Sequence, residues 1–311
     1  MTRSASPATG DIASLLLPLN GVPSETAALS LGLTLARRFS AHLQVLHVAT
    51  DGRDVAPLAG EGLSGAMVEE MMTAAERDSD RRIVSARALL ETALDADAAS
   101  AGGARLAVRG AGAAQAPHQA PHQAGVTFRS VKGREHEVVA HAARLSDLIL
   151  VPHPDAVDEA LSSSEALHAV LFDSGRPAII APKTAPSEIG RRICVAWNGT
   201  AESASAVFSV LGWLHQADSV QVLHSPDYQR RGPAAADLVG YLAMHGIEAG
   251  MTSFRAEGGE VGAALLAAAD SFGADMLAMG AYSHSRLRQL FLGGVTRHVI
   301  AKATLPVLMA R

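Results

Sequence analysis

The sequence predicts an α/β protein built from two tandem, doubly wound, parallel five-stranded sheets. Short apolar runs alternate with helical stretches along the 311 residues. The apolar runs are continuous rather than alternating, which is typical of strands covered on both faces. Much of the sequence also occurs twice, and 311 residues suffice for two domains. Strands alternating with helices favour parallel sheets with right-handed crossovers.

The repeat is visible at several points of the chain. The tetrapeptide Gln-Val-Leu-His stands at 44–47 and again at 221–224, a separation of 177 residues. Later, the apolar run at 147–151 matches the run at 275–279, a separation of only 128 residues. The first copy therefore carries about fifty extra residues between its second and third strands, and two related domains are expected.

We expect these domains at 11–183 and 190–311. In the first, strands are predicted near 12–19, 43–49, 126–131, 147–152 and 177–182, and helices near 24–39, 67–95, 135–145 and 163–173. In the second, helices are predicted near 202–216, 233–245, 260–272 and 295–303. Asn-Gly pairs at 20–21 and 198–199 are turn residues after the first strand of each copy.

The extra segment of the first copy differs in composition from the rest. Residues 96–124 are rich in Ala and Gly and contain a direct repeat of Ala-Pro-His-Gln. His118 and His122 are four apart, but Pro121 disfavours the helix that would align them as metal ligands. A mobile, solvated loop is the preferred interpretation, and we expect residues 100–123 to be dispensable for folding.

Composition excludes several classes of protein. Aromatic residues make up only 4% and the formal net charge is −5, which argues against nucleic-acid binding. The single cysteine, Cys194, lies in an apolar run, so we expect a buried thiol and neither a disulfide nor a CxxC metal site. The N-terminus lacks a signal-peptide pattern, and no apolar run approaches membrane-spanning length. A soluble, cytoplasmic protein without membrane contact is expected.

The stretch from 275 to 311 predicts a strand, a glycine-flanked loop, a helix and a last strand. Between 276 and 311 it has five basic residues and no acid. Glycine lets a backbone approach a bound anion, and a helix starting after such a loop points its free N–H groups at it. A solvated basic loop would give the same pattern.

This stretch resembles the end of a universal stress protein domain. The ATP-binding branch of that family has Gly, two residues, Gly, nine residues, then Gly followed by Ser or Thr. The corresponding positions are Gly280, Ser283, Gly293 and Gly294, so the spacing is kept but two identities are not. The resemblance implies an adenine-nucleotide-binding, Rossmann-like fold of the adenine nucleotide alpha hydrolase type. It also implies dimerisation through the last strand, so the strands at 177–182 and 305–310 should lie near an interface inside an intrachain pseudo-dimer.

The resemblance implies a site for ATP, with Mg²⁺ recruited by the phosphates, in the second copy. The implied cofactor-binding residues are Ala196, Trp197, Asn198, Ser225, Gly280, Ser283, Gly293, Gly294, Val295 and Thr296. Asn198 stands where the family usually has an acid, and it would meet the ribose, while Ser225 would meet the adenine. The matching loop of the first copy, 152–159, has no glycine and three acids, so that copy should be degenerate.

Catalytic residues are not expected. His284 lies between Ser283 and Ser285, but adjacent loop residues do not give the geometry that activates a serine. Slow ATP hydrolysis is the most that the resemblance allows. Three hypotheses follow: a stress-response protein that binds ATP, a universal stress protein without nucleotide that acts through protein contacts, and an enzyme with an unrelated small substrate. A homodimer and further protein partners are compatible with each.

Overall fold

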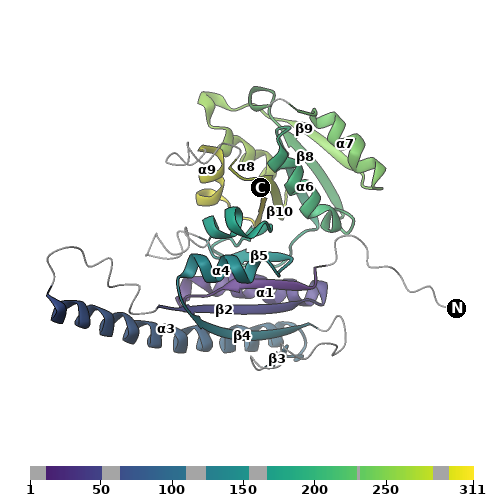
Figure 1. Cartoon of the computed structure of the whole chain (residues 1–311). Helices are drawn as coiled ribbons and strands as arrows, with labels where there is room; N and C mark the ends of the chain where they lie inside the picture. Colours follow the sequence, from purple (N-terminus) through teal and green to yellow (C-terminus); the bar gives the residue numbers. More distant parts are fainter. Residues whose placement is uncertain (1–11, 51–63, 110–123, 154–166, 230–231, 283–293) are drawn as a thin grey trace. The chain divides into compact units, whose positions relative to one another are not determined.

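A computed structural model of the chain describes residues 12–50, 64–109, 124–153, 167–229, 232–282 and 294–311. Internal contacts divide them into two compact units (Figure 1). The N-terminal unit comprises residues 12–176, and the C-terminal unit comprises residues 177–311. Each is a layer of mostly parallel strands flanked by helices, which confirms the predicted fold class.

The N-terminal unit contains a parallel sheet in the order β3-β4-β2-β1-β5. Its strands are β1 Ser14–Pro18, β2 His42–Ala49, β3 Ala107–Arg109, β4 Gly125–Lys132 and β5 Leu148–Val151. Four of them lie where the sequence predicted strands. The fifth, β3, was not predicted, because three residues are too few to show a periodicity.

This sheet is accompanied by the helices α1 Thr26–Phe39, α3 Gly65–Ser100 and α4 Glu135–Ala143. The long helix predicted near 67–95 is α3, which begins after Ser64, whose side chain accepts a hydrogen bond from the Met67 amide. Its buried residues start at Ser79, and its first turns extend past the strands in Figure 1. The rest of α3 packs against α1 and β2. The π-helical segment η5 Val170–Ser174 continues the helical residues 167–169 and packs against α4.

The expectation of a mobile loop over residues 100–123 is wrong for 104–109, while the expectation that the segment is dispensable for folding stays a prediction. Leu106 is buried, and β3 pairs with β4 from Ala107 to Arg109. Arg37 of α1 donates to the Ala104 carbonyl and forms an ion pair with Asp97. These contacts connect the segment to the core. Residues 110–123, including His118 and His122, lie outside the described residues.

The C-terminal unit contains a sheet in the order β6-β11-β10-β7-β8-β9. Its strands are β6 Ala178–Ile180, β7 Arg192–Trp197, β8 Ser219–His224, β9 Ala249–Ser253, β10 Met276–Gly280 and β11 Val307–Ala310. Strands β7 to β11 form the predicted five-stranded parallel sheet. The strand expected at 177–182 adds to this sheet, antiparallel to β11, so the two strands predicted to lie near each other are neighbours.

Four helices accompany this second sheet: α6 Ala201–Leu214, α7 Ala235–Met244, α8 Val261–Phe272 and α9 Gly294–Lys302. Helix α6 packs against β7, β10 and β11, α7 packs against β8 and β9, and α8 packs against α9. Cys194 lies in β7 and is fully buried, as predicted. Burial raises the pKa of its thiol to about 12.

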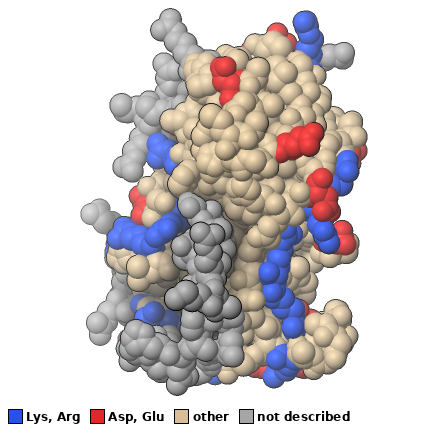
Figure 2. Space-filling view, turned by 90° about the vertical axis from the view of Figure 1, so that its right-hand side faces the viewer, with Lys and Arg blue, Asp and Glu red and all other residues tan. Residues whose placement is uncertain are grey.

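None of the helices in the described residues is long and apolar enough to cross a bilayer. On the face that Figure 2 shows, lysine and arginine side chains occur in small groups among acidic and uncharged residues.

Candidate functional site

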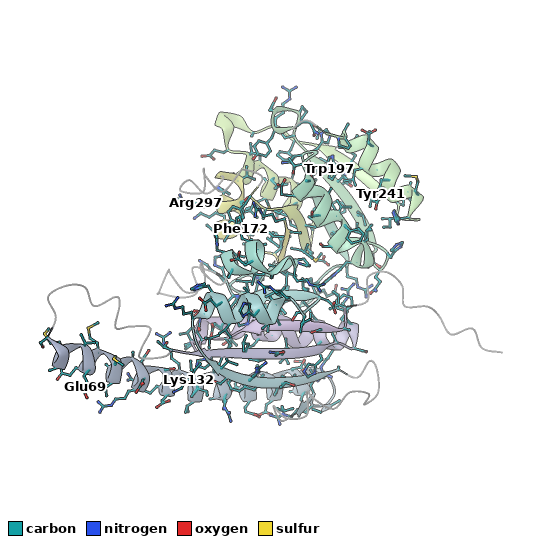
Figure 3. All side chains as sticks on the ribbon, viewed as in Figure 1. Glu69, Lys132, Phe172, Trp197, Tyr241 and Arg297 are labelled. Atoms are coloured by element: carbon teal, nitrogen blue, oxygen red, sulfur yellow. The ribbon has the colours of Figure 1, made fainter. Side chains whose placement is uncertain are left out.

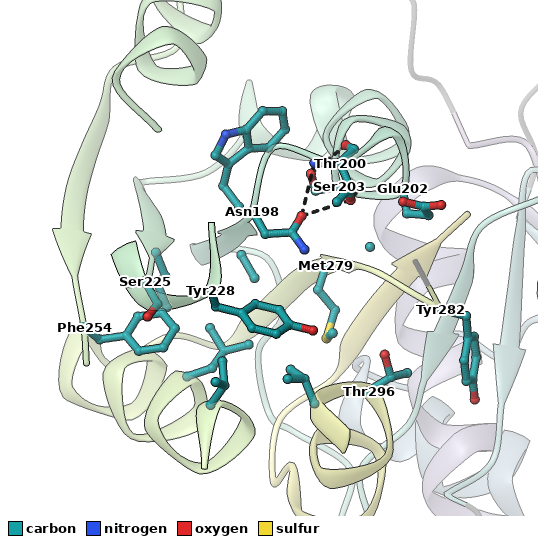
Figure 4. A pocket seen from close by; sticks show the side chains of 17 residues that line it. Asn198, Thr200, Glu202, Ser203, Ser225, Tyr228, Phe254, Met279, Tyr282 and Thr296 are labelled. Carbon is teal, nitrogen blue, oxygen red and sulfur yellow. Dashed lines mark hydrogen bonds between the residues drawn. The ribbon is translucent and has the colours of Figure 1, made fainter. Parts of the chain in front are cut away.

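The C-terminal unit has an open pocket at the carboxyl ends of β7, β8 and β10 (Figure 4). Its empty volume is about 570 Å³, part of which is open solvent. Ligands of open α/β sheets bind outside this edge, where strand order reverses. The pocket is lined by Ala196, Trp197, Asn198, Thr200, Glu202, Ser203, Leu223, Ser225, Tyr228, Phe254, Val261, Leu265, Met279, Gly280, Tyr282, Val295 and Thr296.

Asn198 follows β7, and the next turn determines the orientation of its amide. Its Oδ1 accepts hydrogen bonds from the backbone N–H of Thr200 at 3.2 Å and from the Thr200 hydroxyl at 2.9 Å. Because a backbone N–H can only donate, the bonded atom must be the oxygen. The amide nitrogen therefore points into the pocket, as Figure 4 shows. Thr200 in turn caps α6 by accepting from the Ser203 N–H.

Ser225 follows β8 and supplies a hydroxyl that no other group in the described structure satisfies. The residue is only 4% exposed, and its Oγ has no hydrogen-bond partner. A buried hydroxyl without a partner costs free energy that a ligand can recover. The rings of Tyr228 and Phe254 lie beside it, and the Tyr228 hydroxyl points into the pocket (Figure 4).

Gly280 is the last residue of β10, and close packing explains why this residue is a glycine. A Cβ there would lie 2.5 Å from the Ser203 amide nitrogen and 2.6 Å from the Glu202 carbonyl carbon. The first turn of α6 therefore approaches β10 too closely for any side chain. The sequence pattern relates this glycine to a backbone that approaches a bound anion, and the structure shows that helix–strand packing also requires it.

Helix α9 begins at Gly294, and Thr296 in its first turn is buried against the pocket. A Cβ on Gly294 would meet no atom within 4 Å, so packing of the described residues does not require this glycine. Tyr282, after β10, has a left-handed backbone with φ of 56°, which is uncommon for a non-glycine residue. Unusual backbone of this kind concentrates at ligand sites.

The structure brings seven of the ten predicted cofactor-binding residues together around one pocket. These are Ala196, Trp197, Asn198, Ser225, Gly280, Val295 and Thr296. Gly294 starts α9 but does not line the pocket, while Ser283 and Gly293 lie outside the described residues. The indole N–H of Trp197, labelled in Figure 3, donates to the Pro233 carbonyl at 2.9 Å, so it is used inside the protein.

Sequence reasoning missed the pocket residues that lie on other elements. Thr200 caps α6, Glu202 and Ser203 lie in its first turn, and Tyr228 and Phe254 follow β8 and β9. In the sequence, these residues differ from others only in lying soon after a predicted strand. Many residues of such folds share this position, so it does not identify pocket residues.

Glu202 is the one charged side chain among the described residues that line the pocket. The same described residues include no histidine, cysteine or lysine. His298 of α9 does not line the pocket but packs on α8, where a Cβ at Gly262 would lie 2.7 Å from the His298 Cβ. His284 lies outside the described residues.

The equivalent turn of the N-terminal unit is filled by its own carboxylate. Glu25 is 1% exposed and accepts backbone hydrogen bonds from Asn20, Gly21 and Val22 at 2.9 to 3.1 Å. Burial raises the pKa of this carboxyl, although the backbone bonds oppose the shift. Helix α3 covers the turn, because a Cβ on Gly21 would lie 2.4 Å from the Arg82 carbonyl oxygen. The donors after β1 are therefore already occupied.

Comparison with known proteins identifies the family of the second domain. Residues 190–311 match the model of the universal stress protein family, which confirms the predicted resemblance. No curated protein matches the chain in sequence.

Two solved structures share the fold over nearly the whole chain. A universal stress protein from Archaeoglobus fulgidus is similar with a TM-score of 0.64 at 15% identity, covering 98% of each chain. A protein of unknown function from Pseudomonas aeruginosa has a TM-score of 0.53 at 14% identity, covering 98% of this chain and 94% of that one. These similarities show the fold.

Proposed function

We propose that the universal stress protein domain at residues 190–311 binds an adenine nucleotide, ATP, in the pocket at the carboxyl edge of its sheet. The observation that carries this proposal is the buried Ser225 hydroxyl, which lines the pocket and has no partner among the described residues. A polar group buried without a partner is uncommon in folded proteins and needs an explanation, which a ligand contact in the pocket would supply.

The base would occupy the end of the pocket near Ser225. A serine hydroxyl can accept from the adenine amino group or donate to a ring nitrogen. The aromatic rings of Tyr228 and Phe254 and the aliphatic side chains of Val261 and Leu265 line the same end. Mostly apolar walls with a few placed polar groups are typical of small-molecule sites.

The ribose and phosphates would extend from Asn198 towards α9. The Asn198 amide nitrogen faces the pocket and can donate to a ribose oxygen, where an acid would accept. Thr296 offers a hydroxyl, and the nine-residue helix α9 directs its positive end towards the same region. Val295 lines the pocket in the same turn, and Gly293 and Gly294 would let the backbone approach the phosphates.

Binding, rather than turnover, is the proposed activity. Among the described residues that line the pocket, no hydroxyl is hydrogen-bonded to the Glu202 carboxylate, so slow hydrolysis is the most that we assign. We propose that the chain is a stress-response protein that acts in the cytoplasm. The alternative is a member of the family that binds no nucleotide and acts as a protein-interaction module.

The experiment is a calorimetric titration of the purified chain with ATP and Mg²⁺. The Ser225→Ala variant should bind about tenfold more weakly, close to 1.4 kcal/mol. Its melting temperature should not fall, because the hydroxyl has no protein partner to lose. Ser209→Ala is the matched control, since Ser209 bonds to the Ser205 carbonyl on α6 and does not line the pocket. A wild type that binds no ATP at millimolar concentration contradicts the proposal and leaves the protein-interaction alternative.

A further inference from the structure

The side chain that fits the proposed ligand least well is Glu202. Its carboxylate is the one charged group among the described residues that line the pocket, and ATP carries its negative charge on the phosphates. Two like charges in one pocket repel each other, more strongly where water is partly excluded. A site for the free nucleotide would not place an acid there.

The position of Glu202 relative to the phosphate region is defined by Gly280. A Cβ on Gly280 would lie 2.9 Å from the Glu202 Cβ, so this acid stands directly over the end of β10. Its carboxylate lies on the same side of the pocket as Tyr282, which precedes the segment to α9 (Figure 4). Glu202 therefore stands at the entrance to the region where the phosphates would lie.

A divalent cation converts this repulsion into attraction. Mg²⁺ keeps several waters and is commonly held by one or two carboxylates together with the phosphates of a nucleotide. The described residues contain no group of three or more His, Cys, Asp or Glu that would hold a metal unaided. One carboxylate beside the phosphates fits a metal site whose ligands come from both the protein and the nucleotide. Such a site is complete only when the nucleotide is bound.

We propose that Glu202 is the protein's carboxylate contact to a divalent cation carried by the nucleotide phosphates, directly or through one of its waters. The pocket then selects the metal–nucleotide complex against the metal-free nucleotide. This inference rests on the proposed function and adds to it a residue and a ligand form. It replaces the expectation that the phosphates alone recruit Mg²⁺.

The test compares ATP binding in excess Mg²⁺ with binding in EDTA, for the wild type and Glu202→Gln. The wild type should bind at least about tenfold more tightly with Mg²⁺. In Glu202→Gln this ratio should collapse towards one, since Mg·ATP loses an attraction and free ATP loses a repulsion. Glu248→Gln removes the same charge from an exposed site outside the pocket and should behave as the wild type.

The outcomes separate the two proposals. If the wild type binds ATP in neither condition, the proposed function fails. If the wild type binds ATP but Glu202→Gln keeps the full Mg²⁺ dependence, only the role of Glu202 is overturned. Circular dichroism of both variants establishes that each is folded before it is titrated.

Discussion

The amide nitrogen of Ser203 lies 2.5 Å from the place where a Cβ on Gly280 would be. Cβ atoms do not approach backbone this closely, so the first turn of α6 and the end of β10 are in contact only because residue 280 is glycine. The glycine that begins the nucleotide motif therefore has a packing role that would persist without any nucleotide.

Replacing Gly280 with alanine should destabilise the fold. Forcing α6 away from β10 should cost about 1–3 kcal/mol, as other overpacked sites do. Thermal unfolding would show the loss as a lower melting temperature, whether or not ATP is present. Gly294→Ala is the matched control, because its Cβ would meet no atom within 4 Å and stability should be kept. Equal melting temperatures for Gly280→Ala and the wild type would contradict the packing role.

Replacing Gly294 with valine should leave the stability of the fold unchanged but weaken ATP binding. The described residues leave space for a side chain there, so the variant should fold. If the start of α9 approaches the phosphates, the branched side chain should weaken ATP binding at least about tenfold, or 1.4 kcal/mol. Gly293→Val should behave similarly. Unchanged affinity in both variants would place the phosphates away from α9.

His47 should make the stability of the N-terminal unit depend on pH. It is 1% exposed, its Nδ1 bonds to the Leu19 carbonyl at 2.9 Å, and its Nε2 has no partner in the described structure. Burial lowers the pKa of this histidine from its usual 6.5. The stabilisation is therefore complete above pH 6.5 and is lost as pH falls through the folded-state value, because the unfolded chain takes up the proton first.

Melting temperatures measured from pH 7.5 to 5 would test this, in steps of about half a unit. The His47→Gln variant should lose less stability over this range than the wild type. His224→Gln, in the identical tetrapeptide of the second copy, is the matched control and should keep the slope of the wild type. Parallel curves for wild type and His47→Gln would show that another group is responsible.

Cys194 should be inert in the folded protein. Its thiol is buried and its pKa is raised to about 12, while the reactive species is the thiolate. A thiol reagent at pH 8 should modify the native chain roughly 100-fold or more slowly than the chain in denaturant, which should give one thiol per chain. Rapid native modification would mean that β7 opens readily.

The secondary structure and the repeat followed from the sequence alone because they depend on local patterns. Apolar runs such as those containing Leu150 and Leu277 predict buried strands wherever the chain places them, and the duplicated Gln-Val-Leu-His indicates a common fold. The same logic predicted α3, which has enough turns to show its periodicity. Segment 104–109 could not be predicted, since its order depends on β4 and on contacts with Arg37.

The sequence by itself predicted the family of the second domain, the succession of strands and helices, and the loops that meet at the carboxyl edge of the second sheet. Only the tertiary structure decided what individual residues do there. Gly280 is explained by Ser203, 77 positions earlier in the chain, and Glu202 enters the pocket because α6 packs over β10. The physical reason is that periodicity reports which face of an element is buried, whereas contacts between distant segments depend on how closely two backbones approach.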